Sequence, residues 1–312
     1  MCCLFGLIDY GHHLAGREKT RMVSILAAAC EARGTDATGI AYNVSGDLRI
    51  YKRPLPGHRM RFRIPESVRA VMGHTRMTTQ GSERRNCNNH PFPGVAGKDV
   101  FALAHNGILH NDIQLRRSLH LPGTKIQTDS YIAVQLIEQK KALNFDSLRY
   151  MAEQVEGSFT FTVLDRRDRL YIVKGDNPLC LYHDPSLRLY LYASTEEILR
   201  QAVSRMDLGA HLPCRIPLDC GEILRIDQAG NLERGRFDDT HLLARWQASA
   251  WGLPYLHGGL RRGYHPSQSR SYLDEVKSVA LAFGHDPEEI EYLAEQGFSP
   301  EELEDFLYCG EL

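Results

Sequence analysis

The second residue of the chain could supply both a nucleophile and its base. If the bond between Met1 and Cys2 is cut, Cys2 carries a thiol and a free α-amine on one residue. A thiol must lose its proton before it attacks, and this amine is a base already in place. Because an α-amine titrates near ~8 and a thiol near ~8.5, proton exchange between them is nearly isoenergetic around neutral pH. The alternative is a buried first strand that happens to contain cysteine.

The chain also offers the groups that hydrolysis of a small amide beside a carboxylate needs. Arg76 presents a forked cation that suits a substrate carboxylate, and Asp129 presents an acid that suits an α-ammonium. Asn106 offers an amide NH2 for an oxyanion, and Gly107 offers a backbone N–H that a ligand can approach closely. Each feature alone is common, and Thr128 or Asp129 could simply cap a helix.

Most of these residues lie at the ends of predicted strands, where functional sites are usually built. An apolar strand is predicted at residues 4–9, directly after the thiol. Another strand, at 100–104, runs into the polar cluster that contains Asn106 and Gly107. Asp129 precedes a helical run that extends through Ile137.

The remaining elements come in blocks rather than in strict alternation, which favours an α+β fold over a doubly wound sheet. Helices are predicted at 15–32, 145–155 and 195–203, a hairpin around 46–47, and strands at 158–164, 170–173, 179–182, 189–193, 221–227 and 231–236. We expect three regions: a main domain at 1–238, a linker or extended arm at 239–270, and a short helical appendage at 271–312. Within the appendage, helices should start at Asp286-Pro287 and Ser299-Pro300.

Composition narrows the class of protein. The 312 residues are 43% hydrophobic and carry a formal net charge of −2, so no global basic field points to nucleic acid or to a membrane. No secretory signal precedes the first strand, and no apolar run approaches the ~20 residues of a membrane span. The eight cysteines include no CxxC pair, which is typical of reduced thiols in a cytoplasmic protein.

Two further features have two interpretations each. The arginines at 59, 61 and 63 would share one side of an extended segment, either as a solvated edge or as a docking patch. The pairs His12-His13 and Cys87-x-x-His90 could suggest a metal, but a closed zinc site needs four ligands with supporting spacing. We therefore expect no metal and no cofactor.

Six motifs in order resemble the class II glutamine amidotransferases, a group of N-terminal nucleophile enzymes that includes glucosamine-6-phosphate synthase and amidophosphoribosyltransferase. The resemblance covers roughly residues 2–236. The matching motifs are Cys2-x-Leu4-Phe5-Gly6, Arg33-Gly34-x-Asp36-x-x-Gly39-Ile40-Ala41, His74-Thr75-Arg76-x-x-Thr79-x-Gly81, Asn89-His90-Pro91, His105-Asn106-Gly107-Ile108 and Thr128-Asp129.

The resemblance implies a four-layer αββα sandwich and a glutaminase reaction through a γ-glutamyl thioester on Cys2, freed from Met1. Asn106 and Gly107 would form the oxyanion hole. The residues implied to hold L-glutamine are Arg76, Met77, Thr79, His90 and Asp129. This sequence departs from the family at Cys3, where glycine is usual, at Met77, where tryptophan is common, and at Gln80, where histidine is often found.

Three functions remain open at this stage. The leading hypothesis is a stand-alone glutaminase, free to form a homo-oligomer, that passes ammonia to an acceptor enzyme on a separate chain. A second hypothesis is hydrolysis of a γ-glutamyl or other small amide without ammonia transfer. A third is a glutaminase-like binding module without activity, although intact Cys2, Arg76, Asn106, Gly107 and Asp129 argue against it.

Overall fold

The computed structural model describes residues 2–206, 208, 213–242, 276–277, 280, 286–295 and 303. The chain divides into two compact units, Met1–Leu253 and Pro254–Leu312. All predicted site residues belong to the first unit. The expected boundaries at 238 and 270 stay predictions, since most of the expected linker lies outside the described residues.

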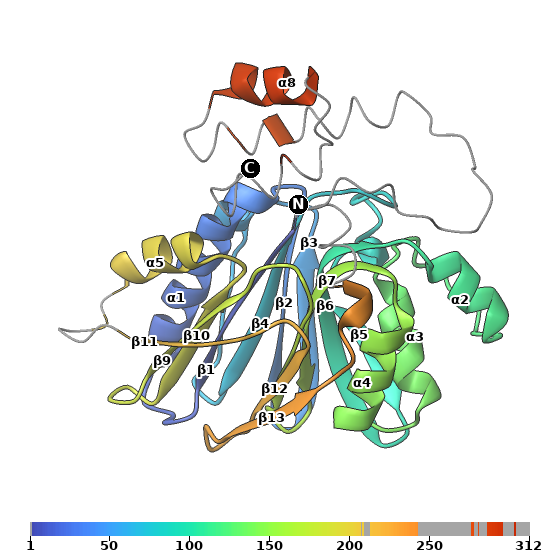
Figure 1. Ribbon diagram of the computed structural model, residues 1–312. Helices are drawn as coiled ribbons and strands as arrows, with labels where there is room; N and C mark the ends of the chain where they lie inside the picture. The colour runs from blue at the N-terminus through green and yellow to red at the C-terminus, as the bar shows by residue number, and fades with distance from the viewer. Residues whose placement is uncertain are drawn as a thin grey trace. The chain divides into compact units, whose positions relative to one another are not determined.

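The first unit contains two antiparallel sheets (Figure 1). The seven-stranded sheet has the order β11-β9-β10-β1-β4-β2-β3. Its strands are β1 (Cys3–Asp9), β2 (Ala37–Val44), β3 (Asp47–Arg53), β4 (Ala70–Arg76), β9 (Cys180–Asp184), β10 (Leu189–Ala193) and β11 (Cys214–Ile216). Every residue of β1 is buried, as suits an apolar strand between two neighbours. The thiol-bearing end of the chain thus leads directly into the middle of a sheet.

The six-stranded sheet has the order β13-β12-β8-β7-β6-β5. Its strands are β5 (Phe92–Ala96), β6 (Asp99–Leu109), β7 (Gly157–Asp165), β8 (Leu170–Lys174), β12 (Glu222–Ile226) and β13 (Leu232–Arg236). The long strand β6 carries the cluster that contains Asn106 and Gly107 near its end. It pairs with β7 over nine residue pairs, which fixes the register of this cluster.

Helices cover the outer faces of both sheets, α1 and α5 on one side and α3 and α4 on the other (Figure 1). The helices of the first unit are α1 (Gly16–Ala29), α2 (Asp112–Ser118), α3 (Tyr131–Gln139), α4 (Phe145–Gln154) and α5 (Glu196–Ser204). The predicted helix at 15–32 continues after Ala29 as a 3₁₀ helix, Cys30–Arg33.

Three clusters of buried apolar side chains separate four layers. One lies between the seven-stranded sheet and α1 and α5, and includes Phe5 and Leu26. Another lies between the six-stranded sheet and α3 and α4, and includes Phe161. The third joins the two sheets and includes Leu4 and Ile172. Alternate residues of β1 therefore enter different cores, and the predicted αββα sandwich is confirmed.

Three helices and strands of the first unit were not predicted from the sequence: β5, α2 and the three-residue strand β11. Strand β5 contains Pro93 and Gly94, which are usually signs of a loop, but it forms a sheet edge, where proline is tolerated. Helix α2 has only seven residues, too few to show a helical period. The predicted hairpin around 46–47 joins β2 and β3 as expected.

The second unit contributes helix α8 (Pro287–Glu295) to the described residues. This helix starts where the Asp286-Pro287 pair predicted, and an Asp286 carboxylate oxygen accepts a hydrogen bond from the Glu288 backbone N–H at 2.9 Å. The predicted start at Ser299-Pro300 lies outside the described residues. Within the part of the chain that the structure describes, no helix has the length and apolar character to span a bilayer.

Candidate active site

The predicted nucleophile lies immediately before β1. The Cys2 thiol donates a hydrogen bond to the Met77 carbonyl at 3.6 Å, and Arg33 Nε donates to the Cys2 carbonyl at 3.0 Å. Arg33 is fully buried at the end of the 3₁₀ helix that follows α1. Burial raises the pKa of the Cys2 thiol, so a base must help to form the thiolate.

Cys3, the unusual neighbour of the predicted nucleophile, faces another part of the molecule. Its side chain is fully buried in the apolar cluster beneath α1, and its backbone is in register with Thr75 of β4. Leu4, the next residue, enters the cluster between the sheets. The Cys3 thiol therefore occupies the helix-side core and does not fill the space around Cys2.

Arg76 ends β4 and is only 3% exposed. Its guanidinium donates to Asn89 Oδ1 at 2.7 Å, to the Gln80 carbonyl at 2.5 Å and to the Gly81 carbonyl at 3.2 Å. All three acceptors are neutral oxygens. Because a guanidinium has five N–H donors, two remain for a ligand among the described contacts. A buried cation with neutral partners favours an anionic ligand such as a carboxylate.

Asp129 is held in place by three hydrogen bonds. Its Oδ2 accepts from the Leu109 backbone N–H at 2.7 Å, and its Oδ1 accepts from the Ser130 hydroxyl at 3.3 Å. Its own backbone N–H donates to Gln80 Oε1 at 2.7 Å. The carboxylate therefore does not act as the helix cap that the sequence also allowed. Asp129 ties the end of β6 to the loop after Arg76, through its carboxylate at Leu109 and through its backbone N–H at Gln80.

Asn106 and Gly107 lie on β6 at this same end of the sandwich. Asn106 is 1% exposed, and its side-chain Nδ2 is buried without a hydrogen-bond partner. Gly107 has φ +138°, and a side chain there would meet the Ser158 carbonyl oxygen at 2.0 Å, so only glycine fits. A buried amide donor without an acceptor is costly, and an oxyanion would satisfy it.

His90 is buried in the interior of the first unit. The centre of its ring lies 4.1 Å from that of the His74 ring and 4.3 Å from that of the Phe92 ring, both in tilted arrangements, and both of its nitrogens lack partners. His74 Nε2 lies 2.9 Å from the His105 carbonyl, which joins β4 to β6. Burial lowers the pKa of His90 well below its usual value and that of His74 to about 3. These rings are therefore neutral near pH 7.

Thr79 is exposed on the loop after Arg76, apart from the buried residues above. Its predicted contact with glutamine stays a prediction, as do the substrate contacts of Met77 and His90. Sequence reasoning missed the contacts of Asn89 and Gln80 with Arg76. Asn89 belongs to the motif that contains His90. Nothing in the residue types of Asn89 and Gln80, however, indicates that Arg76 is their partner.

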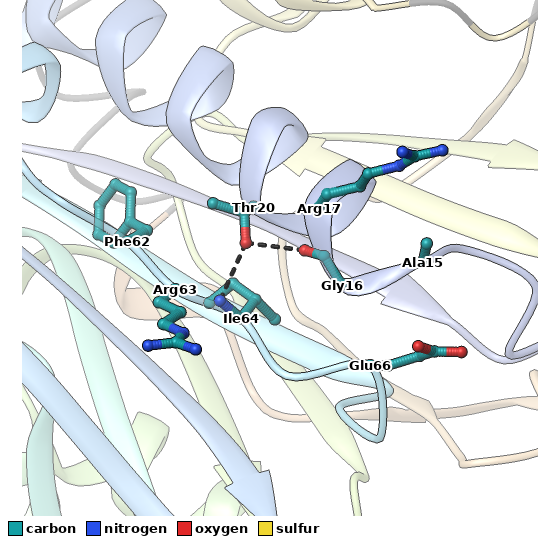
Figure 2. Close-up of a pocket in the computed structure, with 8 residues that line it drawn as sticks. All are labelled: Ala15, Gly16, Arg17, Thr20, Phe62, Arg63, Ile64 and Glu66. Atoms are coloured by element: carbon teal, nitrogen blue, oxygen red, sulfur yellow. Dashed lines mark hydrogen bonds between the residues drawn. The ribbon is translucent and has the colours of Figure 1, made fainter.

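Two hollows on the surface include none of the predicted site residues. One, of about 510 Å³, lies at the start of α1, where Arg17 and Arg63 point away from each other (Figure 2). The other, of about 460 Å³, is lined by residues of the sheet-edge strands β3 and β5 together with Cys87. Arg76, Asn106 and Asp129 are instead buried, and no cluster of metal-ligating side chains occurs in the described ranges.

Comparison with known proteins identifies similar sequences and folds. Residues 74–201 match the family model described as a glutamine amidotransferase domain. The glutamine–fructose-6-phosphate aminotransferase of Bacillus licheniformis is 32% identical over 157 residues, 48% of this chain and 26% of that protein. The 7-cyano-7-deazaguanine synthase of Saccharolobus solfataricus is 28% identical over 207 residues, 63% of this chain and 43% of that protein.

The fold is also similar to a solved structure, the glutamine phosphoribosylpyrophosphate amidotransferase from B. subtilis complexed with ADP and GMP. The TM-score is 0.60 at 20% sequence identity, over 76% of this chain and 49% of the other. The chain thus spans less than half the length of these relatives.

Proposed function

We propose that the chain is a class II glutamine amidotransferase, as its match to a glutamine amidotransferase domain supports, and that it hydrolyses L-glutamine to glutamate and ammonia through Cys2. One observation supports this proposal most directly. The Cys2 thiol donates a hydrogen bond to the carbonyl of Met77, the residue after Arg76, and Arg76 and Asp129 both form hydrogen bonds with Gln80. A cation and an anion close to one thiol suit a substrate that carries an α-carboxylate, an α-ammonium and a cleavable amide.

The reaction starts once the bond between Met1 and Cys2 is cut. The α-amine takes the thiol proton, and Sγ attacks the side-chain amide carbon of glutamine. The oxyanion of the tetrahedral intermediate accepts hydrogen bonds from Asn106 Nδ2 and the Gly107 N–H. The protonated amine returns its proton to the leaving nitrogen, so that ammonia departs and a γ-glutamyl thioester remains. Water, activated by the same amine, then releases glutamate.

The other predicted residues orient the substrate in this proposal. The two remaining N–H donors of Arg76 bind the α-carboxylate, and Asp129 binds the α-ammonium. Thr79 and the backbone around Met77, on the loop that follows β4, help to position the substrate. His90 supports Arg76 indirectly. It is the neighbour in sequence of Asn89, whose side chain accepts a hydrogen bond from the Arg76 guanidinium.

Ammonia is then delivered to an acceptor. Glutamine amidotransferase domains use glutamine and pass ammonia to an acceptor domain or subunit. We assign the acceptor of this protein to a separate enzyme subunit that supplies an electrophilic substrate. Glutamate production that rises when this subunit and its substrate are added would support the assignment.

The experiment that tests the proposal measures glutamate release by the processed protein. Wild-type protein should release glutamate from L-glutamine, and Cys2→Ala should remove the activity. The matched control is Cys87→Ala, since Cys87 is exposed and belongs to none of the assigned groups. Equal rates for wild type and Cys2→Ala would contradict the proposal, whereas hydrolysis of another γ-glutamyl amide alone would favour an amidohydrolase without ammonia transfer.

A further inference from the structure

Gln80 contacts both of the residues that we assign to the two charged groups of the substrate. Its backbone carbonyl accepts a hydrogen bond from Arg76 at 2.5 Å. Its side-chain Oε1 accepts one from the Asp129 backbone N–H at 2.7 Å. The residue therefore bridges the loop that follows β4 and the segment that precedes α3, which lie 49 positions apart in the sequence.

The same two segments are joined a second time. Asn88 Oδ1 accepts from the Gln127 backbone N–H at 3.0 Å, and Asn88 Nδ2 donates to Gln127 Oε1 at 3.1 Å and to the Ser82 carbonyl at 3.0 Å. Asn88 is fully buried. This second contact anchors the base of the loop, so the Gln80 contact can act on the position of Asp129 without being needed to hold the loop as a whole.

We propose that Gln80 is a positioning residue that sets the separation between Arg76 and Asp129 and thereby selects an α-amino acid head group. This inference rests on the proposed glutaminase function. Carboxylate and ammonium are held a fixed distance apart in an L-α-amino acid, so two oppositely charged partners bind both groups only at one spacing. Gln80 couples the two partners directly, and neither bond requires the substrate to be present.

The side chain of Gln80 is a suitable target because Gln80 is exposed. Gln80→Met keeps the length of the side chain and removes the acceptor, and Gln80→Glu keeps an oxygen acceptor at the same length. Only the side-chain bond to Asp129 changes, because the carbonyl that Arg76 contacts belongs to the backbone. Arg84→Ala is the control, since its side chain lies on the same loop and is 90% exposed.

The experiment compares two substrates, L-glutamine and its analogue without the α-amino group. Gln80→Met should raise KM for L-glutamine roughly three- to tenfold, the value of one hydrogen bond, with kcat within about twofold. KM for the analogue should stay unchanged, because it does not use Asp129. Gln80→Glu should retain most of the affinity for L-glutamine, and Arg84→Ala all of it.

Two results would overturn the inference. A general loss of loop structure would raise KM for both substrates together, and an unchanged KM for L-glutamine in Gln80→Met would show that the bond does not position Asp129. These results differ from failure of the proposed function, in which wild-type protein itself would not hydrolyse L-glutamine. Thermal unfolding of each variant separates an effect on the site from an effect on the fold.

Discussion

At the scale of single residues, the candidate site is a set of buried polar groups whose hydrogen-bonding capacity is incompletely used. Arg76 donates to neutral oxygens alone among its described contacts, and Asn106 Nδ2 has no acceptor. Such groups reduce the stability of the folded protein, since each buried polar group without a partner costs about 1–3 kcal/mol. A substrate that supplies the missing partners recovers this free energy on binding or in the transition state.

Replacing Asn106 by Ala should therefore separate activity from stability. The substitution removes an oxyanion donor, so kcat for glutamine hydrolysis should fall about 10²–10³-fold with a small change in KM. The free energy of unfolding should change little, because Nδ2 has no hydrogen bond to lose in the empty protein. Steady-state kinetics and chemical denaturation measure the two effects, and a variant with wild-type kcat would exclude Asn106 from the oxyanion hole.

At the scale of elements, the ends of β1, β4 and β6 bring the nucleophile, the cation and the amide donor to one end of the sandwich. Strand β4 lies beside β1, with Cys3 opposite Thr75, and its His74 contacts the carbonyl of His105 on β6. Strand β2 supports the same end, since His90 packs against Gly39. The position of the His90 segment thus depends on the absence of a side chain at Gly39 in β2.

Gly39→Ala should disturb this packing. A β-carbon at Gly39 would lie 2.2 Å from the His90 carbonyl oxygen and 2.7 Å from Lys52 Cβ, so the backbone must move. We expect the free energy of unfolding to fall by about 1–3 kcal/mol. KM for glutamine should rise as well, since the adjacent Asn89 contacts Arg76. Gly123→Ala is the control, because no atom lies within 4 Å of its added β-carbon; equal stability of the two variants would contradict this account.

The sequence allowed most of the strands to be predicted, and with them the places of the candidate site residues, for a physical reason. Apolar runs such as residues 4–9 and 100–104 identify buried strands, and the polar residues after them must lie at strand ends. The contact between Gln80 and Asp129 could not be predicted, because it depends on how two distant loops meet. The side of the sheet that Cys3 faces could not be predicted either, because it follows from the register of β1 against β4.

At the scale of the whole molecule, three buried histidines link stability to pH. Burial lowers the pKa of His74 to about 3, that of His105 to about 4, and that of His90 well below its usual value. In the unfolded chain each ring titrates near ~6.5. Between these values the unfolded chain binds protons that the folded protein does not, so stability is fully present above pH ~6.5 and is lost as pH falls.

The free energy of unfolding should therefore decrease between pH 7 and pH 5, by up to ~1.4 kcal/mol per pH unit for each of the three rings. His105→Gln should reduce this slope by about one third, whatever its effect on stability at pH 7. The exposed His13 provides the control, and His13→Gln should leave the slope unchanged. Chemical denaturation at several pH values measures the slope, and a flat profile for the wild type would contradict the prediction.

In the proposed reaction Cys2, freed from Met1, forms a thioester with glutamine. Intact and peptide mass spectrometry of active protein, quenched in acid during turnover of L-glutamine, tests it most directly. We predict a chain that starts at Cys2 and an N-terminal peptide that gains one γ-glutamyl group on the Cys2 thiol. An active preparation that retains Met1 throughout, or a glutamyl group attached to Cys3 instead, would contradict the account.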